Sequence, residues 1–292
     1  MVRRFFRKVF KKKLALGSAS IPFFLIIGVQ KGGTTSLYRY LQQHPQVQSA
    51  LTKEIHFFDL NFDKGWGWYL EQLGQKNELG EDDEKLLTGE ASPYYIFHPL
   101  VPERVYRCAP NVKLIVLLRD PVARSLSHYH HERRWQFESL DLEGAINAEN
   151  KRLKSEANNF FDNPYYQSHA FQHHSYTSRG LYLQQLLAWE KYFSKANILI
   201  IQSEFFDKNI EIVLSKVSEF LELESYEFLP SDRHNSGQYP AAPEYLKQRL
   251  ARDFFEANQQ LLRHLENHYP ADNLVGFGPG EVNWLTSMPS SS

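Results

Sequence analysis

Three short, uninterrupted apolar runs recur along the chain, and each is followed by residues that favour turns and helices. Runs of four to eight β-branched and aliphatic residues with no alternation are typical of strands buried on both faces. Between them lie stretches with apolar residues at helical spacing. Strands alternating with helices predict an α/β fold with a central, mostly parallel sheet. The expected strands are residues 21–29, 112–118 and 197–202, and the expected helices are 34–44, 180–193 and 210–221.

The remaining segments are less regular. An acidic turn is expected at 77–85 and a polar helix at 140–156. Residues 157–179, rich in Asn, Tyr, His and Gln, are expected to form a long loop, and loops of this length are usually functional lids or disordered. A long helix is predicted over 243–268, and a frayed tail from Pro279 onward. The sequence contains no repeat and no linker between independent domains.

Composition and charge narrow the class of protein. Of 292 residues, 42% are hydrophobic and 14% aromatic, which suffices for one large core or two smaller ones and excludes disorder, collagen and coiled coil. A formal net charge of -1 lacks the basic excess of a nucleic-acid binder, so no nucleic-acid partner is expected. The single Cys108 cannot form an internal disulfide, which indicates a reducing compartment and favours a cytoplasmic location.

The N-terminal segment departs from this balance. Residues 1–13 contain seven Lys or Arg and no acid, with phenylalanines between them. Such a segment is typical of an arm that contacts a membrane surface or a polyanion, and equally of a solvated terminus. The apolar run that follows has only nine residues and leads into a glycine loop. We therefore expect neither a transmembrane span nor a secretion signal.

The first glycine loop has the chemistry of a phosphate site. It lies between a buried strand and a helix, where glycines admit close backbone approach and the helix N-terminus offers free N–H groups. Lys31 adds a positive charge, and Thr34, Thr35 and Ser36 add hydroxyl groups. The lysine precedes the pair Gly32-Gly33, so the order differs from the G-x-x-x-x-G-K-[ST] pattern of nucleotide hydrolases. A plain glycine turn with a surface lysine is the alternative.

A second cation and hydroxyl pair follows the next strand. Arg119 comes directly after the run 112–118, and Ser127 lies two turns into the helix that Asp120 caps and Pro121 begins. Both side chains can reach one anion beside the sheet. Because ligands of parallel sheets bind beyond the carboxyl ends of the strands, two such sites suit a nucleotide phosphorylated at both ends.

These motifs together resemble the sulfotransferase family that uses 3′-phosphoadenosine 5′-phosphosulfate (PAPS), and most closely its heparan sulfate (glycan) N-/O-sulfotransferase branch. In that family a loop like Lys31-Gly-Gly-Thr-Thr holds the 5′-phosphosulfate, and a segment like Arg119-Asp-Pro with Ser127 holds the 3′-phosphate. The stretch Lys53-Glu-Ile-His-Phe-Phe-Asp59 matches the glycan-branch signature whose glutamate is the usual catalytic base. Residues 90–95 and the helix beginning at Gly180 are also similar.

The resemblance implies a P-loop-NTPase-like fold over residues 21–280, between a basic tail at 1–20 and a C-terminal tail at 281–292. It implies sulfuryl transfer from PAPS to a hydroxyl or amine, with PAP as product, no required metal, and a carbohydrate or another small molecule as acceptor. Eukaryotic glycan sulfotransferases usually carry a membrane anchor and paired cysteines, so a bacterial cytoplasmic enzyme is expected, with peripheral membrane contact through residues 1–13 as an option.

The resemblance also assigns roles to individual residues. Lys31 and the N–H groups of Gly32 to Thr35 would offset charge on the departing phosphate, and Glu54 would accept the acceptor's proton. His56 is the alternative base, since imidazole titrates near neutrality. The expected acceptor contacts are Lys53, Asp59, Ser92 and Tyr94.

One motif departs from the glycan branch. Its members generally have a Lys-Gly-Arg lid before an aromatic-Pro pair, whereas this sequence reads His234-Asn-Ser-Gly-Gln-Tyr-Pro240. Asn235 occupies the lysine position, and Arg233 is the candidate replacement for the missing cation near the sulfuryl group or the 3′-phosphate. This difference bears on the reaction rate and on the identity of the acceptor more than on the identity of the donor.

The histidines form the remaining suggestive group. Two of them, His128 and His131, would share a helix face, but we find no carboxylate at ligand spacing beside them, so a metal site is not expected. Acceptor contact and ordinary packing both remain open, as they do for the aromatic residues of 157–179. The group comprises His128, His130, His131, His169, His173 and His174.

Two other functions compete with sulfuryl transfer. A kinase-like phosphoryl transferase would share the strand–loop–helix phosphate site but lacks the G-K-[ST] order and an obvious strand-end Asp for magnesium. A sulfotransferase-like scaffold could bind membrane or glycan through the basic arm, with Asn235 marking lost activity. Measurements of nucleotide binding and of sulfuryl transfer distinguish these three candidate functions.

Overall fold

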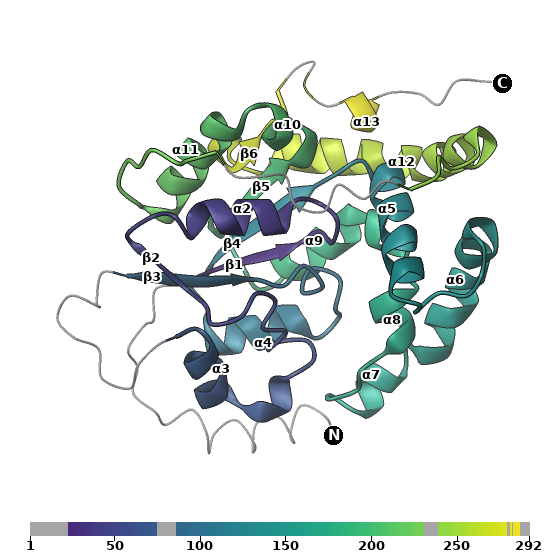
Figure 1. The fold of residues 1–292 in the computed structure, drawn as a ribbon, viewed down its shortest axis with the longest axis horizontal. Coiled ribbons are helices and arrows are strands. Elements are labelled where there is room, and N and C mark those ends of the chain that lie inside the picture. Colours follow the sequence, from purple (N-terminus) through teal and green to yellow (C-terminus); the bar gives the residue numbers. More distant parts are fainter. Residues whose placement is uncertain (1–22, 75–85, 231–238, 279–280, 282, 287–292) are drawn as a thin grey trace.

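A computed structural model describes residues 23–74, 86–230, 239–278, 281 and 283–286. Its centre is a six-stranded sheet in the order β2-β3-β1-β4-β5-β6, and every pair of neighbouring strands is parallel (Figure 1). The α/β prediction with a mostly parallel sheet is therefore confirmed. The strands are β1 (Phe23–Gly28), β2 (Val47–Ser49), β3 (Leu87–Ala91), β4 (Lys113–Leu118), β5 (Ile198–Gln202) and β6 (Leu274–Val275).

Helices cover both faces of the sheet. They are α2 (Thr34–Leu41), α3 (Trp66–Gln72), α4 (Val101–Cys108), α5 (Pro121–Arg134), α6 (Leu142–Glu156), α7 (Asn159–Asp162), α8 (His169–His173), α9 (Tyr182–Glu190), α10 (Ser203–Lys208), α11 (Ile210–Leu221), α12 (Glu244–His268) and α13 (Asn283–Thr286). Short 3₁₀ turns are η1 (Phe62–Lys64), η3 (Ser178–Gly180), η4 (Lys195–Asn197) and η5 (Ala271–Asn273). None of the described helices has the length and apolar character needed to cross a bilayer.

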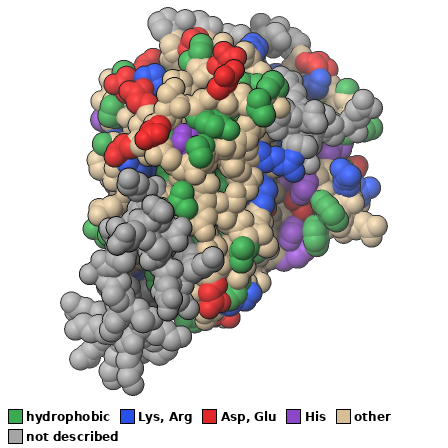
Figure 2. Space-filling model, turned by 60° about the vertical axis from the view of Figure 1, so that its left-hand side comes forward, with side chains coloured by type: hydrophobic (Ala, Val, Ile, Leu, Met, Phe, Trp, Pro, Cys, Tyr) green, Lys and Arg blue, Asp and Glu red, His purple; other side chains and the backbone are tan. Residues whose placement is uncertain are grey.

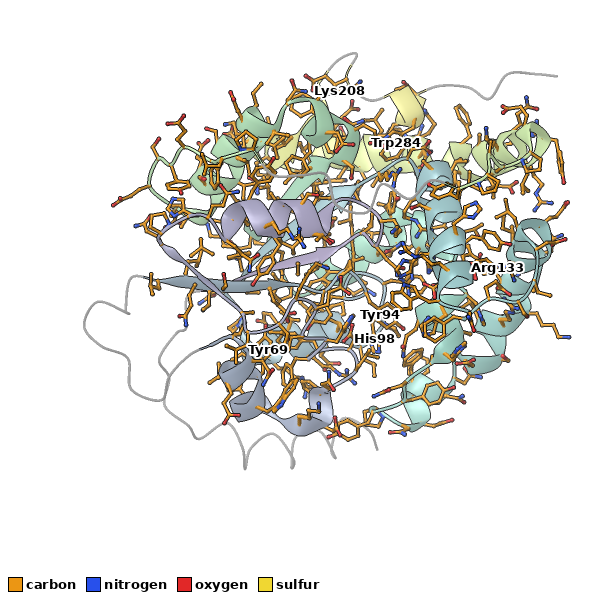
Figure 3. The ribbon with its side chains drawn as sticks, in the orientation of Figure 1. Tyr69, Tyr94, His98, Arg133, Lys208 and Trp284 are labelled. Atoms are coloured by element: carbon orange, nitrogen blue, oxygen red, sulfur yellow. The ribbon has the colours of Figure 1, made fainter. Side chains whose placement is uncertain are left out.

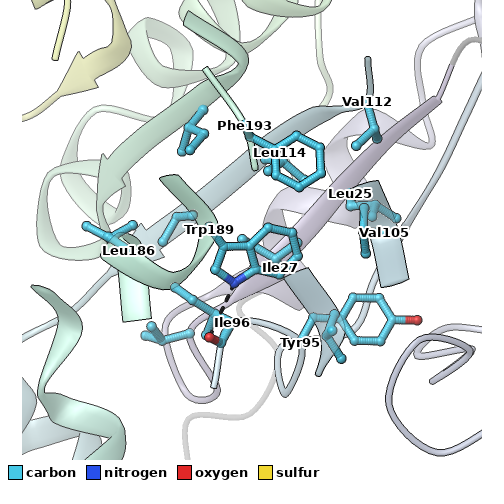
Figure 4. Packing of buried hydrophobic residues seen from close by; sticks show 14 of the residues in the cluster. Leu25, Ile27, Tyr95, Ile96, Val105, Val112, Leu114, Leu186, Trp189 and Phe193 are labelled. Atoms are coloured by element: carbon cyan, nitrogen blue, oxygen red, sulfur yellow. Dashed lines mark hydrogen bonds between the residues drawn. The ribbon is translucent and has the colours of Figure 1, made fainter. Parts of the chain in front are cut away.

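Alternate residues of each central strand enter opposite halves of the core, as strand geometry requires. In β1, Leu25 and Ile27 pack on one face with residues of α3, α4 and α9, while Phe24 and Ile26 pack on the other with α2, α10 and α11. The first half is centred on Trp189, whose indole N–H donates to the Ile96 carbonyl at 3.3 Å (Figure 4). Because both faces are covered, the strands are apolar throughout, which is why they read as continuous runs.

Two expectations for the irregular segments are corrected. Residues 157–179 are not one loop, since they contain α7, α8 and η3. Buried polar side chains hold these turns: the Glu149 carboxylate accepts from Thr177 N and Ser178 N, both at 2.7 Å, and the Ser168 hydroxyl caps α8 by accepting from Phe171 N at 3.0 Å. The prediction of a frayed tail from Pro279 onward is wrong for residues 283–286. These residues form α13, which packs against the core and buries Leu285 completely.

Sequence periodicity missed the shorter elements. The edge strands β2 and β6 have three and two residues, and helices α3 and α4 have seven and eight. Elements this short do not complete enough periods to be recognised. The acidic turn at 77–85 and the basic segment 1–13 lie outside the described residues.

Candidate active site

The carboxyl ends of β1, β4 and β5 open into one cleft, called here the strand-end cleft, with an empty volume of about 1220 Å³. This is the position at which parallel α/β sheets bind ligands. The segments that follow the three strands all contribute to its walls. The lining residues are Gln30, Lys31, Gly32, Gly33, Thr34, Thr35, Ser36, Lys53, Glu54, Pro93, Arg119, Ser127, His131, Ser203 and Asp207.

The glycine loop has the backbone geometry of an anion site. Gly33 is the N-cap of α2 with φ of 95°, a conformation that favours glycine, and no side chain caps the helix. Gly32 is fixed from two directions, because its N–H donates to Val29 O at 2.9 Å and its carbonyl accepts from Ser203 Oγ at 2.7 Å. The first-turn N–H groups of α2 have no intrahelical acceptor, and the residues that carry them line the cleft.

Two cations lie side by side on this loop. The Arg119 guanidinium donates to the Lys31 carbonyl at 2.8 Å, and the Arg119 carbonyl accepts from the Tyr182 hydroxyl at 2.7 Å. Burial and the nearby Arg119 charge lower the pKa of Lys31. Figure 2 shows basic and histidine side chains gathered beside a hollow on one face of the molecule. Adjacent cations that repel one another favour an anion carrying more than one negative charge.

The second predicted anion contact joins the first. Strand β4 pairs directly with β1, and both Arg119 and Ser127 line the same cleft as the glycine loop. Asp120 caps α5 as expected, accepting from Val122 N at 2.9 Å, while its own N–H donates to Glu204 Oε1 at 2.9 Å. The structure thus brings together both halves of the anion site that the sequence placed on separate strands.

Glu54 lies on the opposite wall of the cleft, in the segment Lys53-Glu-Ile-His-Phe-Phe-Asp59. Its carboxylate accepts a hydrogen bond from Lys53 Nζ, and its Oε2 lies 3.4 Å from His56 Nε2. Burial raises the pKa of Glu54, but the contacts with His56 and Lys53 outweigh burial and lower that pKa to about 2. Glu54 is therefore ionised at neutral pH.

His56 is held between two carboxylates. Its Nδ1 lies 2.8 Å from Asp59 Oδ2, and its Nε2 faces Glu54. Burial lowers the pKa of His56, but Asp59 and Glu54 outweigh burial and raise it to about 10. A histidine that already carries its second proton at neutral pH is an orienting cation rather than a proton acceptor.

A second pocket, called here the side pocket, adjoins the cleft and has an empty volume of about 650 Å³. Tyr94 stands in its wall between the sheet and the α5–α8 helices, with the Arg179 guanidinium 4.7 Å from its ring centre (Figure 3). Four residues line both spaces, so the two spaces meet around them: Gln30, Glu54, Pro93 and His131. The other lining residues are His56, Leu60, Tyr94, Glu132, Phe137, Gln172, His173 and Arg179.

Two predicted acceptor contacts lie elsewhere. Ser92 is completely buried, and its hydroxyl accepts from His56 N at 3.1 Å while donating to Glu90. Asp59 is only 4% exposed and accepts from Leu60 N at 2.7 Å besides contacting His56. Neither residue lines the strand-end cleft or the side pocket, and both contact His56; their acceptor contact remains a prediction. Lys53 lines the strand-end cleft, and Arg233 and Asn235 lie outside the described residues.

Sequence reasoning missed several lining residues. Ser203 and Asp207 follow β5, so applying the strand-end rule to the third strand would have found them. His131 was not missed, since the histidine group includes it; it lies four residues after Ser127 on α5, which puts both on one helix face. Gln30 and Pro93 have no comparable signal, since neither residue type indicates a site by itself.

The histidine group does have a carboxylate, contrary to expectation. Glu132, four residues after His128 on α5, has Oε1 at 3.2 Å from His128 Nε2 and Oε2 at 2.8 Å from His173 Nδ1. His173 also stacks on Phe137 with ring centres 4.0 Å apart. Among the described residues, no group of three or more His, Cys, Asp or Glu is arranged to hold a metal ion.

Comparison with known proteins agrees with this geometry. A family model described as a sulfotransferase domain matches residues 22–238. The chain therefore belongs to the sulfotransferase family, whose P-loop-NTPase-like fold is the one described above. The sulfotransferase from Alicyclobacillus acidocaldarius has a similar solved structure, with a TM-score of 0.62 and 27% identity, covering 84% of this chain and 96% of that one.

Two curated relatives indicate the branch. The membrane-associated sulfotransferase kil1 of Dictyostelium discoideum is 27% identical over 319 residues, covering 87% of this chain and 67% of that protein. The human heparan sulfate glucosamine 3-O-sulfotransferase 3B1 is 27% identical over 271 residues, covering 88% of this chain and 63% of that protein. The chain thus spans about two thirds of the length of these relatives. The predicted resemblance to glycan sulfotransferases is confirmed.

Proposed function

We propose that the protein transfers a sulfuryl group from PAPS to a hydroxyl or amine of a carbohydrate acceptor. The observation that carries this proposal is the meeting of the strand-end cleft and the side pocket at Glu54, an ionised carboxylate. A donor held in the first space and an acceptor held in the second would place the reacting atoms between them. Membership of the sulfotransferase family supports the reaction class.

The residues of the cleft fit PAPS. Its two phosphorylated ends need two groups of anion contacts, and the cleft offers the uncapped N-terminus of α2 with Lys31, and Arg119 with Ser127. When bound, PAPS supplies an activated sulfuryl group on a phosphate that leaves as PAP. Lys31 and the N–H groups of Gly32 to Thr35 would stabilise the negative charge that grows on the leaving phosphate oxygen.

Glu54 acts as the general base in this proposal. As the new bond from acceptor oxygen or nitrogen to sulfur forms and the bond from sulfur to phosphate oxygen breaks, the acceptor's proton passes to the Glu54 carboxylate. His56, positively charged and fixed by Asp59, holds that carboxylate in place. Lys53, which bonds Glu54 and also lines the cleft, links the base to the donor site.

The side pocket is the proposed acceptor site. Its walls combine the aromatic faces of Tyr94 and Phe137 with polar groups of Gln172 and His173. Aromatic faces with a few convergent polar groups suit a sugar, which has apolar C–H faces and hydroxyl edges. Similarity to the heparan sulfate 3-O-sulfotransferase supports a carbohydrate acceptor.

The test is a transfer assay with radiolabelled PAPS and a panel of neutral, amino and anionic oligosaccharides. We expect label on at least one oligosaccharide, and we expect PAP, but not ATP, to raise the melting temperature. ATP stabilisation without PAP stabilisation would instead favour a phosphoryl transferase. Stabilisation by PAP without any transfer would favour a binding scaffold.

A further inference from the structure

Glu90 is a buried carboxylate with an unusual environment. It lies on β3 next to the central strand, is 1% exposed, and accepts four hydrogen bonds. Oε1 accepts from the hydroxyls of Tyr95 at 2.7 Å and Tyr69 at 3.0 Å, and Oε2 accepts from Ser92 Oγ at 2.6 Å and Ile55 N at 3.2 Å. Within the described residues, no Lys or Arg forms an ion pair with it. Burial raises the pKa of Glu90, although its hydroxyl partners and the His56 charge act in the opposite direction. A carboxyl group placed here is costly, so its retention calls for an explanation.

Three of the four hydrogen bonds lead to the loop that carries Glu54. Glu90 binds the N–H of Ile55 directly, and its partner Ser92 accepts from His56 N at 3.1 Å. A further partner of Glu90, the Tyr95 hydroxyl, accepts from the next two amides, Phe57 N at 2.9 Å and Phe58 N at 3.3 Å. Four successive amides, from Ile55 to Phe58, thus converge on Glu90 or on hydroxyls that Glu90 orients.

The loop needs this support because its backbone is strained. Glu54 and His56 have φ of 60° and 52°, in the left-handed region that residues with a Cβ rarely occupy. Each such conformation costs about 1–3 kcal/mol and persists only where surrounding contacts enforce it. Turning successive N–H groups toward one point is what alternating left-handed residues achieve, and the resulting concavity binds an anion. Here the Glu90 carboxyl group bonds the first of these amides directly, and the next three bond hydroxyls that donate to Glu90.

We propose that Glu90 is a positioning residue that fixes the Glu54 loop in its strained conformation, so that the Glu54 carboxylate faces both the strand-end cleft and the side pocket. The proposal rests on the function of Glu54 proposed above. Glu90 itself lines neither space, so it acts through Ser92, Tyr95 and the loop amides. Its loss should therefore affect turnover rather than donor binding.

Two tyrosines provide a matched pair of variants. Tyr69 lies on α3 (Figure 3), and the ring of Tyr95 packs in the core beside Ile96 (Figure 4). Both residues are completely buried, and both donate to Glu90 Oε1. Changing either to Phe removes one hydroxyl bonded to the same carboxylate oxygen. Only Tyr95 also accepts from the loop amides of Phe57 and Phe58. Comparing the two variants therefore distinguishes an effect on the position of the loop from an effect on the stability of the site around Glu90.

The experiment measures kcat, the acceptor KM, the PAP dissociation constant and Tm for Glu90→Gln, Tyr95→Phe and Tyr69→Phe. We expect Glu90→Gln and Tyr95→Phe to lower kcat by about tenfold or more, because small displacements of a reacting group cost up to about 10²-fold. PAP affinity should stay within about twofold of the parent value, and Tyr69→Phe should keep most of kcat. If Glu90→Gln does not fold, the two tyrosine variants decide.

A pH profile adds a readout that stability alone would not move. The low pKa of Glu54 depends on its contacts with His56 and Lys53, so a displaced loop should shift the acid limb of kcat to higher pH in Tyr95→Phe but not in Tyr69→Phe. If the parent protein is active and the two tyrosine variants have equal kcat and equal pH profiles, the positioning role of Glu90 is overturned. The proposed function would not be affected by that result. A parent protein with no transferase activity would overturn the proposed function and this inference with it.

Discussion

The two walls of the strand-end cleft are built in different ways. On one wall, the glycine loop and the start of α2 present backbone N–H groups and the side chain of Lys31, all within residues 30–36. On the other wall, Glu54 projects from a strained loop whose amides are held by side chains about 35 residues later in the chain, among them Glu90 and Tyr95. The groups of the first wall come from one short stretch of chain, which Arg119 and Ser203 bond from neighbouring strand ends, whereas the loop of the second wall is held by side chains that follow another strand.

This difference indicates which wall of the cleft is more sensitive to substitution of the residues that hold it. A site made of helix N–H groups is present whenever the helix is. A loop held by a buried carboxyl group depends on the partners that bond both that group and the loop amides, because losing one of them leaves loop amides unsatisfied. We therefore expect variants of the first wall to affect donor binding, and variants of the second to affect turnover.

The largest effect is expected for Glu54→Gln. The amide cannot accept the acceptor's proton, so kcat should fall by about 10²–10⁴. PAP binding should persist, since Lys31, Arg119 and the loop amides are unchanged. Measuring kcat together with calorimetric PAP affinity checks both parts. Activity near the parent level would remove Glu54 from the role of base.

A smaller effect is expected for Lys31→Ala. Removing a charge-assisted contact to a phosphate should weaken PAP binding by about 10- to 100-fold. The matched control is Lys216→Ala, which removes an exposed lysine of α11 that pairs with Glu219 away from the cleft. The two dissociation constants, measured at one ionic strength, provide the comparison. Equal affinities would place the phosphate elsewhere.

The backbone of the first wall is tested by a pair of glycines. A Cβ on Gly32 would lie 2.9 Å from Val29 O and 3.0 Å from Leu117 O, so Gly32→Ala should cost about 1–3 kcal/mol in the free energy of unfolding and weaken PAP binding. A Cβ on Gly67, in α3, meets nothing within 4 Å, so Gly67→Ala should be neutral or stabilising by up to about 1 kcal/mol. Urea unfolding of both variants measures the difference. A stable Gly32→Ala variant with normal PAP affinity would refute the tight loop geometry.

The second wall has a pH signature. The pKa of His56 is raised to about 10, so its contribution to stability is fully present below its ordinary value near 6.5 and is lost as pH rises toward 10. The difference in unfolding free energy between the parent and His56→Gln should therefore shrink from pH 6 to pH 10. Denaturation at pH 6, 8 and 10 measures it. A difference that does not change with pH would show that folding leaves the pKa of His56 at its ordinary value.

The contrast between the walls also explains what the sequence could reveal. The strands before Lys31 and Arg119 are continuous apolar runs, so the sheet and the position of both cations were predictable from local pattern. The match of Lys53 to Asp59 with a family signature identified the loop, but not which of its partners face the acceptor. Ser92 and Asp59 were expected to contact the acceptor, and the structure places both against His56, where neither lines the cleft or the side pocket.

The parts that could not be predicted depend on tertiary contacts. Nothing in the spacing of Glu90, Tyr69 and Ile55 shows that their polar groups meet, because β3 and α3 are brought together only by the packed sheet. In the same way, Glu132 meets His173 only because α8 folds back onto α5. Long-range polar networks of this kind leave no periodic trace in a sequence.

Calorimetric titration of PAP into the folded protein tests most directly whether the strand-end cleft holds a doubly phosphorylated adenosine. We predict saturable binding of one PAP per chain that is weakened by Lys31→Ala and unaffected by Glu54→Gln. Absence of binding to a protein shown to be folded by its cooperative unfolding transition would contradict the assignment of the cleft, and the roles given to both of its walls.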